Sequence, residues 1–163
     1  MKVAAVKGGS MDDVAGIFAR EFSAVDGHIQ VGVAQGRVIS VDFPARPQDD
    51  ARTDHDLLDR IGGYLNGDSD AFGDVTVALT LPTDKRRVLE ALREVPYGET
   101  VTVGQLARMT AGLDDDEEAD LRTVRDALRE NPAPVVIGDH RVGNAAGATP
   151  TEVATVCRRL EGL

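Results

Sequence analysis

The sequence predicts an α+β protein, in which short antiparallel strands precede a set of amphipathic helices. Three observations predict this class. Apolar residues alternate over 28–44, and they recur at helical spacing over 82–95, 120–132 and 151–162. Turn-forming Gly, Pro, Asn and Asp separate these segments. The length of 163 residues fits one medium domain or two small ones.

The first half is expected to combine a hairpin with a helix. Residues 1–26 are ambiguous and leave room for a short helix over 11–22. The alternating segment 28–44 has AQGR at its centre, which indicates a β-hairpin. A polar surface loop is expected over 44–56. The next segment, 55–68, predicts a helix that ends at Asn66-Gly67, with these residues on its apolar face: Leu57, Leu58, Ile61 and Leu65.

A strand is expected over 74–82, and the second half then becomes mainly helical. Residues 82–95 predict a helix with Thr83 or Asp84 as its N-cap. Its buried face should hold Val88, Leu89, Leu92 and Val95. The tetrapeptide PYGE at 96–99 is typical of a turn.

Two further helices are expected after this turn. One begins near Thr102 and ends by Gly112, and the other covers 120–130 and ends at Asn131-Pro132. The acidic residues of 113–120 suit a loop that leads into a helix N-terminus. The apolar run 133–138 predicts a strand. A C-terminal helix follows, with these residues on one face: Val153, Val156, Cys157 and Leu160.

The charge balance is strongly acidic. There are 28 acidic and 18 basic residues, a net charge of −10, and lysine occurs only at positions 2, 7 and 85. Abundant Asp and scarce Lys favour a halophilic source, and an ordinary acidic mesophile protein is the alternative. The N-terminus has no continuous apolar region, so no signal peptide is expected. Because no stretch approaches about 20 apolar residues, we expect a cytoplasmic protein.

Few residues suit metal or cofactor chemistry. Cys157 is the single cysteine, which excludes an internal disulfide and a multi-cysteine zinc site, and we expect it to be buried as a small apolar residue. His28 and His55 have no metal-ligand spacing, and GNAAGA at 143–148 lacks the Lys-Ser/Thr of a phosphate loop. We expect neither a metal site nor a cofactor.

Two groups of residues could carry function. Arg122, Arg125 and Arg129 fall on one face of the helix 120–130, as expected of a recognition helix that faces phosphates. A solvated face balanced by nearby acidic residues explains the same spacing equally well. The pair Asp139-His140 could serve acid–base chemistry or a metal, but neighbouring strand residues point to opposite faces.

The second half resembles the O6-alkylguanine-DNA alkyltransferase family. The resemblance rests on VLEALREVPYGETVTVGQLA, then RDALRENPAPVVIGDHRV, and RRLEG near the C-terminus. It covers about 84–163 with specific motifs and 28–83 less specifically, and 1–27 is a segment of unknown role. It implies a small RNase H-like N-terminal domain over 28–83 and a winged helix-turn-helix-like DNA-binding domain over 84–163.

In that family a helix-turn-helix enters the minor groove, and an arginine finger replaces a guanine that is flipped into a pocket. A cysteine in Pro-Cys-His-Arg-Val then accepts the alkyl group. By motif, the finger is Arg129, the asparagine behind it is Asn131, and the histidine–glutamate pair is His140 and Glu161. The cysteine position is Asp139, a poor nucleophile toward an alkyl carbon.

Other positions also depart from the family pattern. The tyrosine expected after Thr102 is Val103, and Arg125 and Asp126 stand where the recognition helix has small residues. The Tyr-x-Gly-Gly segment that closes the lesion pocket is missing, and the proline before the cysteine is Gly138. Arg141, with the three arginines of 120–130, still offers a phosphate-binding surface.

The resemblance therefore implies a DNA-binding, alkyltransferase-like protein that lacks methyltransferase activity and senses alkylated bases. Its expected partners are the minor groove of double-stranded DNA and other repair proteins, and a monomer is expected. In the alternative, the chain is a degenerate scaffold in which Asp139, His140 and Glu161 form a structural network or bind a small ligand. A hydrolase that uses Asp139-His140 is the third interpretation.

Overall fold

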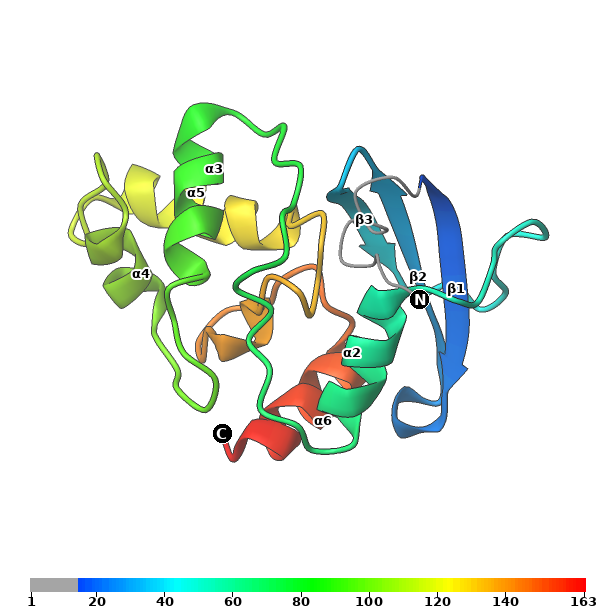
Figure 1. Ribbon diagram of the computed structural model, residues 1–163. Coiled ribbons are helices and arrows are strands. Elements are labelled where there is room, and N and C mark those ends of the chain that lie inside the picture. Colours follow the sequence, from blue (N-terminus) through cyan, green and yellow to red (C-terminus); the bar gives the residue numbers. More distant parts are fainter. Residues whose placement is uncertain (1–14) are drawn as a thin grey trace. The chain divides into compact units, whose positions relative to one another are not determined.

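The computed structural model describes residues 15–163, which divide into two compact units (Figure 1). The first unit extends to Asp68 and includes Asp74–Ala78, and the second holds Ser69–Gly73 and Leu79–Leu163. The described residues form a three-stranded antiparallel sheet and five α-helices, so the predicted mixture of strands and helices is confirmed.

The sheet of the first unit is a simple meander. Its strands are β1 (Gly16–Phe22), β2 (Gly27–Ala34) and β3 (Arg37–Asp42), in the order β1-β2-β3. The predicted hairpin corresponds to β2 and β3. Gln35 and Gly36 connect these strands with φ of 54° and 74°, the left-handed conformation that a two-residue hairpin turn requires.

The short helix for which 11–22 left room is not found in its described part, because Gly16–Phe22 is β1. This strand pairs with β2 along its whole length, and Phe18 and Ala19 are buried. Pairing with a neighbouring strand decides the conformation of a segment whose local pattern is ambiguous. Residues 1–14, including most of the N-terminal segment on which the signal-peptide expectation rests, lie outside the described residues.

Helix α2 (Asp56–Leu65) packs against β1 and agrees with the prediction for 55–68. Its four predicted apolar residues are all buried. Gly67, just after the C-cap Asn66, has φ of 111°. At the other end, the N-cap is His55, whose Nδ1 accepts a hydrogen bond of 3.0 Å from the Leu57 amide.

We expect His55 to make the stability of the protein depend on pH. Burial lowers the pKa of His55 below its ordinary value of 6.5, against the opposing effect of nearby aspartates. Because the folded pKa is depressed, this contribution to stability is complete above pH 6.5 and is lost as the pH falls through the folded pKa. Urea unfolding from about pH 7.5 to 5 should show this loss in the wild type.

His55→Asn is the matched variant for this prediction, because Asn can cap a helix and does not titrate in this range. The difference in unfolding free energy between the two proteins should change with pH in the window below 6.5, since other groups cancel. A difference that stays constant from about pH 7.5 to 5 would contradict the assignment.

Residues 74–82 form less of a strand than the sequence predicts. One parallel bridge joins Val38 to Val77, with hydrogen bonds from the Val38 amide to Thr76 O (2.8 Å) and from the Ala78 amide to Val38 O (2.9 Å). The chain passes into the second unit at Leu79, and Pro82 has no amide to continue a ladder. The pairing with β3 therefore ends after one bridge.

Three helices of the second unit pack together: α3 (Thr83–Leu92), α4 (Val103–Met109) and α5 (Glu118–Arg129), as Figure 1 shows. The four residues predicted to be buried over 82–95 are buried. The N-cap of α3 is Pro82, not Thr83 or Asp84, and Pro82 makes no side-chain cap. Asp84 lies in the first turn of α3, where its carboxylate accepts from the Lys85 amide.

The connections between these helices follow the predicted turn chemistry. In the 96–99 turn, the Glu99 amide donates to Pro96 O and Gly98 has φ of 84°. Thr102 caps α4 in a reciprocal capping box with Gln105, and α4 ends three residues before Gly112. Helix α5 has Glu118 and Asp120 in its first turn and ends before Asn131.

The predicted strand over 133–138 is absent, and a buried turn takes its place. The Ile137 amide donates to Ala133 O at 2.8 Å, and Val135 has φ of 76°. Residues 133–138 are all buried, so the apolar run reflects burial. Pro132 and Pro134 lack amide donors, which disfavours a ladder. The turn leads into a 3₁₀ helix, η2 (Asp139–Arg141).

Helix α6 (Thr151–Glu161) closes the second unit and packs against η2. Its buried residues are Val153, Ala154, Cys157 and Glu161, whereas Val156 and Leu160 are half-buried. Cys157 has an exposed fraction of 0%, which confirms that it is buried. Among the described residues, no helix is long and apolar enough to cross a membrane.

Candidate functional site

Three ionisable residues in a row are buried in η2. The exposed fractions of Asp139, His140 and Arg141 are 2%, 1% and 2%. Because a 3₁₀ helix has about three residues per turn, successive side chains diverge in three directions. The expected alternation between two strand faces is therefore replaced by a turn that sends each side chain to its own surroundings.

Asp139 is held by hydrogen bonds to one of its oxygens. Its Oδ2 accepts from Asn131 Nδ2 (3.0 Å) and from the amides of Ala148 (3.0 Å) and Thr149 (3.2 Å). Asn131 also donates from Nδ2 to Ile137 O, and its Oδ1 accepts from the Ala133 amide. The carboxylate thus joins the end of α5 to the loop before α6.

Burial raises the pKa of Asp139 above its ordinary value of 3.8. The hydrogen bonds from Thr149 and Asn131 and the nearby His140 oppose this rise. A buried carboxylate loses solvation, and hydrogen-bond donors restore only part of it. Asp139 is therefore an acid for which ionisation is harder than in water.

His140 and Arg141 share one partner, Glu161 of α6. His140 Nε2 lies 2.6 Å from Glu161 Oε2, and Arg141 donates from Nε to Oε1 (2.8 Å) and from Nη2 to Oε2 (3.0 Å). The Gly98 amide also donates to Glu161 Oε1 at 2.9 Å. Since an ionised carboxylate only accepts, Nε2 is the protonated nitrogen in this contact.

Backbone pairing fixes η2 beside the start of α4. The Val101 amide donates to Arg141 O at 2.9 Å, and the Gly143 amide donates to Val101 O at 2.8 Å. Asn144 Oδ1 then accepts from the Val103 amide at 2.8 Å, which satisfies a donor in the first turn of α4. The Asp139–Arg141 turn and the start of α4 are thereby joined by hydrogen bonds.

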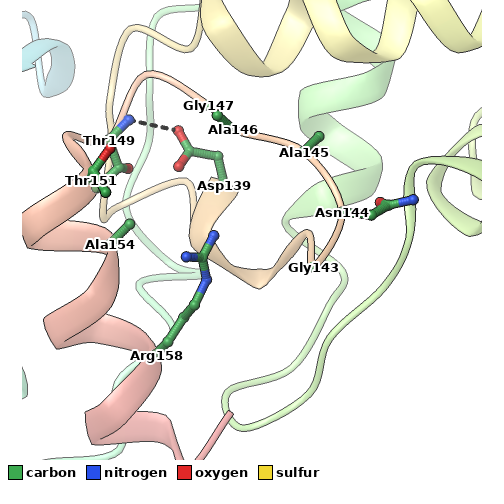
Figure 2. Close-up of a pocket in the computed structure, with 10 residues that line it drawn as sticks. All are labelled: Asp139, Gly143, Asn144, Ala145, Ala146, Gly147, Thr149, Thr151, Ala154 and Arg158. Atoms are coloured by element: carbon green, nitrogen blue, oxygen red, sulfur yellow. Dashed lines mark hydrogen bonds between the residues drawn. The ribbon is translucent and has the colours of Figure 1, made fainter.

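A cavity of about 380 Å³ opens beside Asp139 (Figure 2). Its walls are formed by Asp139, the loop after η2 and one face of α6. Small residues dominate the loop wall, and Arg158 projects from α6. The lining residues outside α6 are Asp139, Gly143, Asn144, Ala145, Ala146, Gly147 and Thr149.

The loop wall approaches Asp139 closely at Gly147. A Cβ at position 147 would lie 2.6 Å from both Asp139 Cβ and Oδ2, so any side chain there would require the loop to move. This proximity lets the following two amides reach Oδ2. The missing Cβ is therefore part of how the loop holds the carboxylate.

The arginines predicted to face phosphates lie on α5. Arg122 and Arg129 are exposed and Arg125 is half-buried. Arg129 pairs with Asp126 at 2.9 Å and Arg125 lies 3.7 Å from Glu118, whereas Arg122 forms no ion pair with any described residue. Thr102 is exposed at the N-terminus of α4.

Three other residues expected at the DNA surface are buried instead. The exposed fractions of Val103, Asn131 and Arg141 are 2%, 4% and 2%. Val103 packs into the helical core, Asn131 supports Asp139, and Arg141 is paired with Glu161. Each side chain packs against or bonds to other residues of the protein. These three residues therefore support the site and do not offer a surface to DNA.

Several residues of the site were not found from the sequence. Arg158 donates from Nε to His140 O at 2.9 Å and also lines the cavity. The backbone donors of Gly98, Ala148 and Thr149 leave no side-chain signal. Arg158 could have been suspected, since it precedes Glu161 by three residues and so lies near it on α6.

Comparison with known proteins agrees with this arrangement. The family model for the DNA-binding domain of 6-O-methylguanine DNA methyltransferase matches residues 84–161. A methylated-DNA–protein-cysteine methyltransferase from Methanopyrus kandleri is 34% identical over 101 residues, 62% of this chain and 72% of that protein. The namesake from Mycolicibacterium paratuberculosis is 32% identical over 90 residues, 55% and 51% of the two chains.

Solved structures show the same fold. Mycobacterium tuberculosis OGT in complex with DNA superposes with a TM-score of 0.66 at 21% identity, over 90% of this chain and 91% of that chain. The O6-methylguanine-DNA methyltransferase of Pyrococcus kodakaraensis gives 0.66 at 19% identity, over 91% and 100%.

The fold and the buried Asp139–Arg141 turn thus define a protein built like a DNA alkyltransferase. The chain belongs to the methylated-DNA–protein-cysteine methyltransferase family.

Proposed function

We propose that this protein binds double-stranded DNA and does not transfer alkyl groups. The observation that carries the proposal is Asp139, which stands at the cysteine position of the family motif while other residues of that motif are kept. Asn131 lies on one side of it, and the His140–Glu161 pair follows it in the chain. We infer that the protein recognises alkylated bases and marks them for other repair proteins.

The chemistry of Asp139 supports the absence of transfer. Alkyl transfer uses a soft, strongly nucleophilic thiolate, and a carboxylate is a poor nucleophile toward an O-alkyl carbon. Three donors already occupy Asp139 Oδ2. Cys157, the single thiol of the chain, is fully buried in α6 and does not line the cavity.

We assign the DNA surface to α4 and α5, as a winged helix-turn-helix that enters the minor groove. Arg122 is exposed and has no ionic partner among the described residues, so its charge is available to a phosphate. The family motif places the arginine finger at Arg129, which must first leave Asp126. Arg122 is therefore expected to contribute at least as much as Arg129 to binding.

A degenerate scaffold is the second candidate, and the acidic residues near α5 favour it. Glu118 and Asp126 lie beside two of the three arginines, and Arg108 of α4 pairs with Asp115. These carboxylates compete with phosphates for the same cations. High salt screens this internal competition and the attraction to DNA alike, so only a binding measurement separates the two candidates.

The test is a titration of fluorescent duplexes, with and without one O6-methylguanine, in about 1 M KCl. Wild-type protein should bind both duplexes. Arg122→Ala should weaken binding by about tenfold, as for loss of one charge-assisted hydrogen bond. Arg159→Ala is the control, because Arg159 is exposed on α6. Failure of the wild type to bind either duplex would leave the scaffold as the better description.

A further inference from the structure

The cavity beside Asp139 contains a fixed hydrogen-bond acceptor. All three hydrogen bonds to Asp139 reach Oδ2, and Oδ1 accepts none from a described residue. In Figure 2 the second carboxylate oxygen points toward Thr149 and Thr151 at the wall of the cavity. Because Asp139 is only 2% exposed, this oxygen can be satisfied only by the buried Thr149 hydroxyl or by a group within the cavity.

The same cavity contains a donor on the α6 wall. Arg158 uses Nε to donate to His140 O, and its terminal nitrogens donate to no described residue. No ion pair joins Arg158 to Asp139, although both line the cavity. A ligand between them would therefore meet an anionic acceptor at one point and a cationic donor at another.

The remaining walls are small and leave room for a heterocycle. Alanine and glycine at 145–147 and Ala154 contribute little bulk, and the volume of about 380 Å³ is in the range of small-molecule pockets. The charged groups of Asp139 and Arg158 then dominate the polar lining, to which Asn144, Thr149 and Thr151 also contribute.

Guanine has the complementary pattern. It carries N–H donors at N1 and N2 and acceptors at O6 and N7, and arginine is a common partner of the two acceptors. O6-alkylguanine lacks the N1 proton, so its N1 is an acceptor. Placed against an ionised carboxylate, that N1 would give two acceptors facing each other without a hydrogen between them.

We propose that the Asp139 cavity selects purines that carry an N1–H donor, such as guanine and hypoxanthine, over O6-alkylguanine. This inference rests on the proposed function, because it takes the cavity as a pocket for a nucleobase. It assigns the cavity to the keto base, so that contacts to an alkylated base in DNA would be made outside the cavity, at the α4–α5 surface. Asp139, at the position of the alkyl acceptor in the family motif, would here accept a hydrogen bond from the N1–H of the base.

The test uses free deoxynucleosides, so that it does not require binding of duplex DNA. Protein-detected NMR titrations in about 2 M KCl compare deoxyguanosine, deoxyinosine, O6-methyldeoxyguanosine and the deoxyriboside of 2-aminopurine. The pH is kept near 8, since burial raises the pKa of Asp139. Deoxyguanosine should bind about tenfold or more tightly than O6-methyldeoxyguanosine, the value of a hydrogen bond to a charged group.

The 2-aminopurine arm separates hydrogen bonding from bulk. This base has the N2 amine and an acceptor N1, but it carries no methyl group and no O6. If the selectivity comes from a hydrogen bond between N1–H and Asp139, 2-aminopurine should bind as weakly as O6-methylguanine. Binding of 2-aminopurine as tight as that of guanine would show that the pocket merely excludes bulk, and it would overturn the proposal.

Asp139→Asn is the decisive variant because it changes one atom of the site. The asparagine oxygen can still accept from Asn131 and the two loop amides, while its NH₂ replaces Oδ1 in the cavity. The preference should then invert toward O6-methyldeoxyguanosine, whose N1 accepts from that NH₂. Arg159→Ala, outside this cavity, should keep the wild-type order.

Two further results would overturn the proposal. One is a wild-type protein that binds no deoxynucleoside or binds O6-methyldeoxyguanosine as tightly as deoxyguanosine. The other is a folded Asp139→Asn variant that keeps the wild-type order. Failure of the proposed function can be told apart from failure of this proposal. In that case the protein would bind no duplex, while it would still bind deoxyguanosine.

Discussion

Replacing Glu161 with alanine should destabilise the protein by about 3–5 kcal/mol, the range measured when one partner of a buried ion pair is removed. Glu161 accepts from Arg141, from the Gly98 amide and from His140. Without it, a guanidinium with a side-chain exposure of 3% loses its carboxylate. Urea unfolding in about 2 M KCl measures the change.

Glu152→Ala is the matched control for this prediction. Glu152 lies exposed in the first turn of the same helix, where a carboxylate adds about 0.3–1 kcal/mol through the helix dipole. Glu161→Gln should fall between the two variants, since it keeps the shape but loses the charge. A loss below about 1 kcal/mol for Glu161→Ala would show that the buried cluster contributes little to folding.

Replacing Asp139 with cysteine should create methyl transfer from O6-methylguanine in DNA. The variant supplies a thiol at a position followed by His140, which contacts Glu161. It also removes the carboxylate oxygen that faces the cavity. We expect transfer at least about 100-fold faster than in the wild type, a change of about 2.7 kcal/mol in the barrier. Intact mass spectrometry would detect the added methyl group.

Two controls make this result specific. Asp139→Ser retains a small polar side chain without a thiol and should remain inactive. Asp139→Cys combined with Cys157→Ala should transfer as well as the single variant, because Cys157 lies buried outside the cavity. A folded Asp139→Cys protein without transfer would mean that the pocket, rather than the missing thiol, prevents the chemistry.

The fold was predictable where local signals agree with tertiary contacts. The hairpin of β2 and β3 has alternating apolar residues and a turn at Gln35-Gly36, and α2 has both a periodic face and an end signal at Asn66-Gly67. The predictions failed where an apolar run has two interpretations. Residues 133–138 are buried as a turn, and Gly16–Phe22 joins the sheet through contacts distant in sequence.

The site was predictable mainly through the motif. The resemblance identified Asp139, His140, Glu161 and Asn131, and these residues cluster around η2 in two separate networks. The burial of Arg141 could not be predicted, because a charged residue is ordinarily exposed. Val103 was expected at the DNA surface from its motif position alone, although valine is among the residues most often buried. The backbone amides of Ala148 and Thr149 could not be foreseen, since any residue can supply them.

We propose that the protein holds alkylated DNA without taking the alkyl group. Native mass spectrometry of the wild-type protein, mixed in ammonium acetate with a duplex that carries one O6-methylguanine, tests it most directly. We expect a protein–duplex complex that releases the protein at its unmodified mass on dissociation. Absence of the complex, or a released protein heavier by one methyl group, would contradict it.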